Sequence, residues 1–170
     1  MGYSIRLARE GEARGLPALE MDAAAAFRAV GLGAIADDDA WEDEHYLEAV
    51  RAGQVWVAAD HDDRVVGFAV ADELDGEAYV AEISVRAAHA RRGIGRRLMG
   101  ALIDRARQQG YREVTLTTFR DVPFNGPFYR TLGFREVAVG PDRPELAAAR
   151  QREKDAGVDI KPRIAMVLRL

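Results

Sequence analysis

A short arginine-rich loop with two glycines is the segment of this chain best suited to hold an anion. Residues 91–97 read Arg-Arg-Gly-Ile-Gly-Arg-Arg, between a strand-like run over 78–86 and an amphipathic run over 94–109. Glycine has no Cβ, so its backbone amide can approach a ligand closely. A helix that begins there directs unpaired N–H groups and the positive end of its dipole at the same place. The loop therefore predicts a pyrophosphate pocket.

Two common phosphate-binding motifs do not fit this loop. A dinucleotide fingerprint needs a small residue where Leu98 stands and an acid at the end of the next strand, and neither requirement is met cleanly. A P-loop needs Lys-Ser or Lys-Thr after its glycines, and none follows here. Neither a Rossmann nor a P-loop enzyme is favoured. A plain tight turn with solvated arginines stays open as the simpler alternative.

The composition narrows the class of protein. The length of 170 residues is typical of one globular domain. The net charge of −4 argues against general nucleic-acid binding. The absence of cysteine excludes disulfides, a thiol nucleophile and cysteine-ligated zinc, and fits a reducing compartment. The three histidines lack metal-ligand spacing, so no metal is expected. No apolar run predicts a signal peptide or membrane span, and we expect a cytoplasmic, bacterial-like protein without membrane partners.

Hydrophobic periodicity predicts a mixture of strands and helices. We expect strands over 3–8, 55–59, 64–73, 77–86, 112–118, 134–139 and 163–170. We expect helices over 12–30, 40–52, 94–109, 126–132 and 142–156. The Asp75-Gly76 pair predicts a tight hairpin within an antiparallel meander, and the strand–helix–strand run from 77 to 118 predicts one parallel crossover. The predicted fold class is α+β, with a central, mostly antiparallel sheet flanked by helices in a single domain over residues 1–170.

Several helix ends carry predicted caps. Residues 37–39, all aspartate, are expected to cap the helix over 40–52, and Asn125 to cap the helix over 126–132. Glu145 completes a capping-box-like pattern at the start of the helix over 142–156. Gly110 stands where a left-handed C-terminal cap belongs, and Gly133 is expected to end the helix over 126–132. The helix over 94–109 is expected to bury Ile94, Leu98, Leu102, Ile103 and Ala106.

Two segments resemble the signatures of the GNAT family of N-acetyltransferases. The run Ala-Glu-Ile-Ser-Val over 81–85, followed by the loop over 91–96, resembles the acetyl-CoA-binding motif, and the run over 125–134 resembles the second signature. The order of elements fits the family from residue 3 to about 139. One departure is Ala90, where the family commonly has Gln or Arg. We therefore expect phosphate binding to depend on backbone amides, with Arg91 supplying part of the missing side-chain role.

The resemblance implies an acyltransferase that moves the acetyl group of acetyl-CoA directly to a primary amine of a small molecule or peptide, without a metal. In this interpretation acetyl-CoA is a cosubstrate, and Val85 pairs its backbone with the pantetheine arm and polarises the thioester carbonyl. The cosubstrate-binding residues implied by the resemblance are Ile83, Val85, Arg91, Arg92, Gly93, Ile94, Gly95, Arg96 and Asn125.

Two residues are the candidates for proton transfer. Tyr129, on the short helix, would donate a proton to the departing sulfur, since a phenol stays protonated at neutral pH. The alternative is a tyrosine that only packs against Phe128. Glu82 is the candidate base and would need partial burial to raise its pKa. Its alternative is an ordinary strand glutamate that faces solvent or pairs with an arginine.

The acceptor is less defined by the sequence. Phe27, Trp41 and Tyr46 are candidates to line its site, each with core packing as the alternative, and residues 37–39 would attract a cationic amine. The segment after Pro141 shapes the acceptor site, forms a homodimer interface, or supplies only a capping helix and an edge strand. Competing functions are a catalytically weak CoA-binding sensor and, least favoured, nucleic-acid binding through the arginines.

Overall fold

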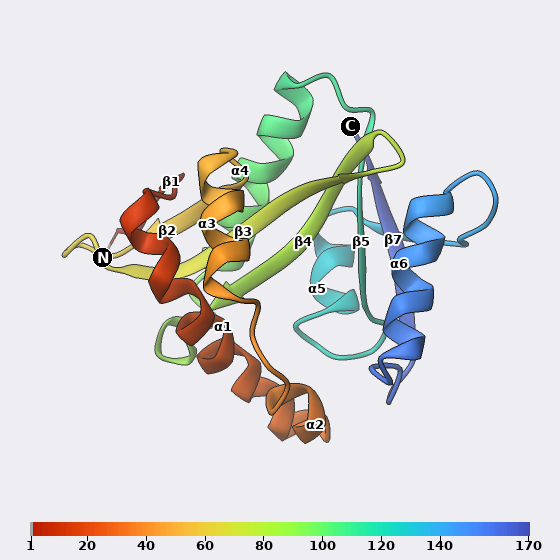
Figure 1. Ribbon diagram of the computed structural model, residues 1–170, viewed down its shortest axis with the longest axis horizontal. Helices are drawn as coiled ribbons and strands as arrows, with labels where there is room; N and C mark the ends of the chain where they lie inside the picture. The colour runs from red at the N-terminus through yellow and green to blue at the C-terminus, as the bar shows by residue number, and fades with distance from the viewer. Residues whose placement is uncertain (1) are drawn as a thin grey trace. The chain divides into compact units, whose positions relative to one another are not determined.

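A computed structural model describes residues 2–170 and contains one seven-stranded mixed sheet (Figure 1). The strand order is β1-β2-β3-β4-β5-β7-β6. The strands are β1 (Ser4–Leu7), β2 (Val55–Ala59), β3 (Val65–Leu74), β4 (Glu77–Val85), β5 (Glu113–Phe119), β6 (Arg135–Val137) and β7 (Arg163–Arg169). The α-helices are α1 (Leu16–Ala24), α2 (Gly33–Ala36), α3 (Asp43–Arg51), α4 (Ile94–Gln108), α5 (Gly126–Thr131) and α6 (Pro144–Asp155), and the 3-10 helices are η1 (Glu10–Gly15), η2 (Ala25–Val30) and η3 (Ala87–His89).

The pairing of the strands confirms the predicted fold class. β2 pairs antiparallel with both β1 and β3, and β7 pairs antiparallel with both β5 and β6. β4 and β5 are parallel, as the crossover through α4 predicts. The chain divides into two compact units, each described by itself below. The first comprises the residues up to Ala71 together with Ala81–Asp104, and the second comprises Asp72–Val80 and Arg105–Leu170.

The first unit is built on both faces of β2 and β3. Side chains alternate along a strand, so Val57 and Phe68 point to one face, where they join buried residues of η1, α1 and α3. Gly67 belongs to the opposite face, where a Cβ would lie 3.3 Å from Ile94 at the start of α4. The absence of a side chain there lets α4 begin close to the sheet. All five residues expected on the buried face of α4 are buried.

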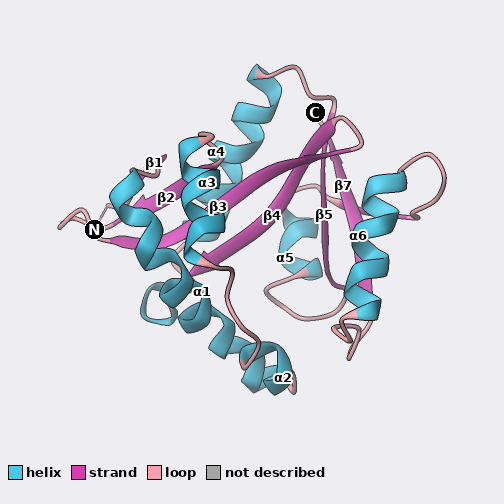
Figure 2. Cartoon of the chain, viewed as in Figure 1, coloured by secondary structure: helices cyan, strands magenta, loops and turns pink. Residues whose placement is uncertain are grey.

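In the second unit, charged and polar side chains connect α6 to β5 and β7. The strands and helices of the chain are drawn by type in Figure 2. Arg150, 7% exposed, donates to Glu153 and Asp159, and Arg163 donates to Glu153 at 3.0 Å. Glu153 also accepts a hydrogen bond from Thr117 of β5. β7 lies between β5 and β6, so the last strand is internal to the sheet and is not the edge strand that the sequence left open.

Two predicted helix boundaries are wrong. The helix expected over 12–30 is divided into η1, α1 and η2, and Pro17 stands in the first turn of α1, where its missing N–H is tolerated. Residues 37–39 do not cap the next helix, since α3 begins later, at Asp43. Asp37 instead forms an ion pair with Arg28. A run of acids ahead of an apolar pattern is thus not enough to locate a helix start.

The caps predicted from Glu145 and Asn125 are also wrong, since no N-cap side chain forms a cap bond at the start of α6 or α5. Asp75 lies in the β3–β4 turn, 70 residues before α6, and its carboxylate accepts the N–H groups of Glu145 and Leu146 at 2.8 and 3.0 Å. Asn125 precedes α5, but its side chain makes no capping bond. The left-handed cap at Gly110 is confirmed by a φ of +83°, and the predicted end of α5 before Gly133 is confirmed as well, with φ of +96° at that glycine.

The start of α5 depends on a glycine. A Cβ at Gly126 would overlap the carbonyl oxygen of Arg120, so we expect Gly126→Ala to lower the free energy of unfolding by about 1–3 kcal/mol. Gly100→Ala is the matched control, because no neighbouring atom lies within 4 Å of its Cβ position inside α4. The control should raise that free energy by about 0.5–1 kcal/mol. Urea denaturation measures both, and equal effects would contradict the packing described for Gly126.

Candidate active site

The arginine-rich loop has the backbone shape of an anion cradle. Arg91 and Gly93 both adopt left-handed conformations, with φ of +62° and +77°. The N–H of Arg97 donates to the carbonyl of Gly93 at 3.1 Å, so the hydrogen bonding of α4 starts at this glycine. The first-turn amides of Ile94 and Gly95 have no acceptor inside the helix as a consequence of helix geometry. The loop therefore directs backbone donors outward at the positive end of a 15-residue helix.

Tyr3 anchors this loop. The Tyr3 hydroxyl is 2.9 Å from Nδ1 of His89 and accepts a hydrogen bond from Arg92 at 3.1 Å, and its carbonyl accepts one from Arg97 at 2.7 Å. Asp22 of α1 accepts the N–H of Ala87 at 2.8 Å and so fixes the start of η3. These contacts hold the loop from both sides. The arginine side chains of the loop nevertheless stay exposed, where an anion can reach them.

Glu82 lies on β4, ahead of the loop in the same unit. Its Oε1 accepts hydrogen bonds from the Ser84 hydroxyl at 2.9 Å and from the Ile83 N–H at 3.2 Å. Burial, with help from the nearby charge of Glu20, raises the pKa of Glu82 to about 8, although those two hydrogen bonds oppose the shift. Glu82 forms no ion pair in the described residues, so the alternative of pairing with an arginine is not the arrangement seen. A carboxyl of this kind can exchange a proton near neutral pH.

Glu20 of α1 is a further acidic residue near the candidate site that the sequence analysis did not single out. Its Oε2 accepts a hydrogen bond from the Tyr46 hydroxyl and one from the Trp41 N–H at 3.2 Å. Tyr46 is buried, and its pKa is raised well above the ordinary value by burial first and by Glu20 second. Glu20 and Tyr46 are 26 residues apart along the chain, beyond the range of any local pattern.

The predicted acceptor residues divide into packed and half-buried ones. Tyr46 packs edge-on against Phe68, with ring centroids 5.4 Å apart, and is a core residue as its alternative stated. Trp41 is half-buried and lies 5.3 Å from the Tyr46 ring. Phe27 is half-buried on η2.

The other two predicted site residues lie in the second unit. Asn125 directs Nδ2 to the Phe124 carbonyl at 3.2 Å, whereas its Oδ1 is buried and has no hydrogen-bond partner. An acceptor atom left in this state fits an amide donor supplied by a ligand. Tyr129 is 5% exposed, and its ring packs against Phe128 and Phe134 at centroid distances of 5.2 and 5.8 Å. Tyr129 therefore packs as its alternative stated, and its role as proton donor stays a prediction.

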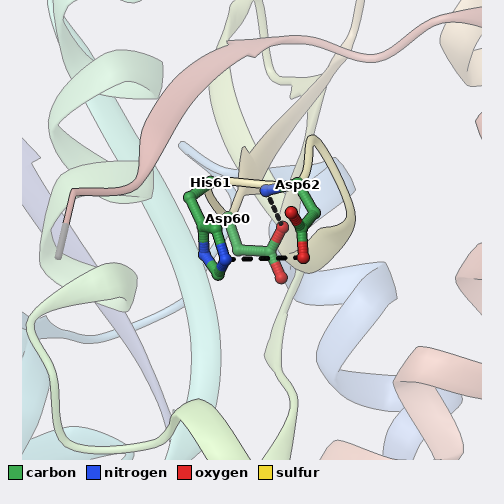
Figure 3. Close-up of side chains that lie close together, drawn as sticks. All are labelled: Asp60, His61 and Asp62. Atoms are coloured by element: carbon green, nitrogen blue, oxygen red, sulfur yellow. Dashed lines mark hydrogen bonds and ion pairs between the residues drawn. The ribbon is translucent and has the colours of Figure 1, made fainter.

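One group of side chains within the described residues has ligand atoms close enough for a metal ion, the turn Asp60-His61-Asp62 (Figure 3). The Asp60 carboxylate accepts the N–H of Asp62 at 2.9 Å and that of Arg64 at 3.0 Å, and these bonds lower its pKa. Nε2 of His61 lies 3.4 Å from Oδ2 of Asp62. The group is thereby explained as the turn between β2 and β3.

No helix within residues 2–170 is both long and apolar enough to cross a membrane.

The raised pKa of Glu82 predicts a pH-dependent stability. The folded protein keeps the Glu82 proton up to about pH 8, whereas the unfolded chain loses it near 4.5, so this stabilisation is complete below pH 4.5 and disappears as the pH rises through 8. Glu82→Gln removes the titration. We expect the variant's free energy of unfolding, relative to the original protein, to be higher at about pH 9 than at about pH 5 in urea denaturation. The same difference at both pH values would contradict a desolvated Glu82.

Comparisons with known proteins agree with the fold described above. The sequence model of the acetyltransferase (GNAT) family matches residues 18–134, more than half of the chain. The PaiA N-acetyltransferase of Thermoplasma acidophilum, in complex with coenzyme A, aligns over all of both chains with a TM-score of 0.73 at 14% identity. A GNAT acetyltransferase of Staphylococcus aureus Mu50 aligns over 99% of both chains, with a TM-score of 0.73 at 16% identity. Rv2747 of Mycobacterium tuberculosis, in complex with coenzyme A and NLQ, aligns over 98% of this chain and 99% of its own, with a TM-score of 0.68 at 22% identity. These structures share the fold, and the family match shows that this chain belongs to the acetyltransferase (GNAT) family.

Proposed function

We propose that this protein transfers the acetyl group of acetyl-CoA directly to a primary amine of a small molecule or peptide, with the whole chain acting as one N-acetyltransferase domain. The observation that carries the proposal is the anion cradle over 91–96 at the start of α4, with left-handed backbone at Arg91 and Gly93. It follows, in the same unit, the half-buried Glu82 of β4, whose pKa burial raises to about 8. Family membership and the coenzyme A in the structures of two similar proteins support the same donor.

The residues proposed to hold the donor suit its chemical parts. The amides from Arg91 to Arg96 would bind the pyrophosphate, because backbone donors at a helix start favour negative charge. The extended backbone at Ile83 and Val85 would pair with the pantetheine arm as an added strand does. The partnerless Oδ1 of Asn125 would accept a hydrogen bond from a pantetheine amide N–H. Acetyl-CoA supplies the activated acyl group, and these residues orient it.

Two proton transfers accompany the reaction. Glu82 accepts a proton from the acceptor nitrogen, and the nitrogen forms a bond to the thioester carbonyl carbon. The carbon–sulfur bond breaks, and the Tyr129 hydroxyl donates a proton to the departing thiolate. The net proton moves from the acceptor amine to the thiol of CoA, so charge and atoms balance once both side chains have exchanged protons with water.

The direct test is an acetyl-CoA-dependent screen of amines read by the release of CoA thiol. The chain contains no cysteine, so a thiol reagent reacts only with the product. We expect thiol release that requires both acetyl-CoA and an amine, with the acetylated amine identified by mass spectrometry. Binding of CoA without turnover of any amine would contradict the catalytic proposal and would favour a sensor.

Tyr129→Phe tests the general acid. Positioned proton transfer contributes about 10²–10⁴-fold, so we expect kcat to fall within that range while the affinity for CoA, measured by calorimetry, stays the same. Tyr111→Phe is the matched control, since its hydroxyl donates to Glu73 at 2.6 Å and has no place in the proposed reaction. Unchanged kcat in Tyr129→Phe would leave the residue with packing alone.

A further inference from the structure

A cavity of about 530 Å³ lies in the first unit, beside η1, α1 and the turn that joins β2 to β3. Small-molecule sites in proteins have volumes of about 300–1,000 Å³. Apolar side chains of α1 and β3 form part of the lining, namely Leu16, Leu19, Val65 and Val66. Within residues 2–170 the lining includes neither Glu82 nor any residue of the loop over 91–97. The cavity is therefore separate from the residues proposed to transfer the acetyl group.

Arg86, directly after β4, lines this cavity and lacks an anionic partner. It is half-buried, its Nε donates to the Val65 carbonyl at 3.4 Å, and it forms no ion pair within residues 2–170. A guanidinium withdrawn from water costs free energy unless an anion balances its charge. The other described arginines that are half-buried or buried each pair with a carboxylate, and they are Arg6, Arg120, Arg143, Arg150 and Arg163. Arg86 therefore marks a place where an anion from outside the chain fits.

The acids that line the same cavity have other partners. Glu12 accepts two hydrogen bonds from Arg6, at 2.6 and 3.0 Å. Asp60 accepts two backbone N–H groups of the β2–β3 turn, at 2.9 and 3.0 Å. Neither carboxylate forms a hydrogen bond or an ion pair with Arg86 in the described part of the chain. The counter-ion of Arg86 is thus not supplied by the cavity itself.

The charges of the lining indicate which anion fits. Arg64 and Arg86 bring positive charges to the cavity, and Glu12 and Asp60 bring an equal number of negative ones. A balanced lining disfavours a doubly charged anion, because each added charge also meets the two acids. The Nη1 and Nη2 edge of Arg86 has no partner within residues 2–170, and such an edge matches one carboxylate with two parallel hydrogen bonds. A single carboxylate is therefore favoured over a phosphate dianion.

We propose that this cavity binds a small organic acid with one carboxylate and an apolar body. Arg86 pairs with the carboxylate through Nη1 and Nη2, and the apolar body lies against Leu16, Leu19 and Val66. Arg64 adds a second positive charge from the β2–β3 turn. The binding involves no covalent step and does not depend on the proposed acetyl transfer, so it gives the protein a second ligand site.

Calorimetric titration with hexanoate and with hexanamide, its uncharged analogue, tests the proposal. We expect hexanoate to bind about 10-fold more tightly than hexanamide or better. Arg86→Gln should weaken hexanoate binding about 10- to 100-fold and leave hexanamide binding unchanged, because only the hydrogen bonds to a charged group are lost. Arg105→Gln, exposed on α4 and outside the lining, is the matched control and should change neither affinity. Equal affinities for hexanoate and hexanamide in the original protein would overturn the proposal.

A second measurement locates the ligand in the original protein and needs no variant. Gly11 and Gly15 line the cavity, so their backbone N–H signals in NMR spectra report on its occupant. We expect saturable shifts of both signals on addition of hexanoate, and none at Gly157 in the second unit. If the largest shifts fall instead in the loop over 91–97, hexanoate occupies the anion cradle and the proposal is wrong.

Arg64→Gln and inorganic phosphate complete the test. Arg64 is exposed, and its ion pair with Asp62 is loose at 3.9 Å, so this variant removes charge without disturbing the core. We expect hexanoate binding to weaken about 2- to 5-fold, the value of an exposed charge. Phosphate that shifts Gly11 and Gly15 at lower concentration than hexanoate would contradict the carboxylate assignment. No acetyl-CoA is used, so a failure here leaves the proposed acetyl transfer standing, and a failure of acetyl transfer leaves this site standing.

Discussion

The partial burial of the Glu82 carboxyl, under the influence of the charge of Glu20, is the constraint on which the proposed chemistry depends. A glutamate in water has a pKa near 4.3 and is too weak a base for an ammonium. Burial and the charge of Glu20 raise the pKa of Glu82 to about 8, which is closer to the near-neutral pH at which a general base is most effective. This arrangement destabilises the ionised protein above neutral pH. The raised pKa of Glu82 thus both lowers the stability of the ionised protein and allows the carboxyl to exchange a proton near neutral pH.

The first unit is organised so that this constraint is met. Residues of η1, α1 and α3 share a core with β2 and β3, and that packing fixes both Glu20 and Tyr46. On the opposite face, Gly67 leaves room for Ile94, so α4 starts close to the sheet and its first turn presents the anion loop. The core that holds Tyr46 and the helix start that carries the anion loop therefore lie on opposite faces of β2 and β3, and an error in β3 would disturb both.

The strands and the buried face of α4 could be predicted from the sequence because their signals are local. Alternating side chains, the Asp75-Gly76 turn and the glycine caps each act within a few residues. The errors arise where a partner comes from far away in the chain. Asp75 supplies the cap of α6 across 70 residues, and nothing near Glu145 indicates it.

The candidate site follows the same division. Glu82 can be found from the sequence because its place on a strand before the loop is a local motif, and its need for burial follows from the ordinary pKa of a glutamate. Glu20 cannot be found in this way, because its importance comes from contacts with Trp41 and Tyr46 that only the fold creates. Asn125 is expected at the right place but with the wrong bond. Its side-chain oxygen is without a partner, whereas the sequence pattern indicates an ordinary helix cap.

The most direct measurement is the infrared carbonyl band of protonated carboxylic acids, recorded from mildly acidic to alkaline pH and compared with Glu82→Gln. We expect one band in the original protein that persists at neutral pH, titrates with a midpoint of about 8 and is missing from the variant. A protein whose carboxyl groups are all ionised before neutral pH is reached would contradict this expectation. Glu82 would then be an ordinary surface acid, without the burial on which the proposed proton transfer depends.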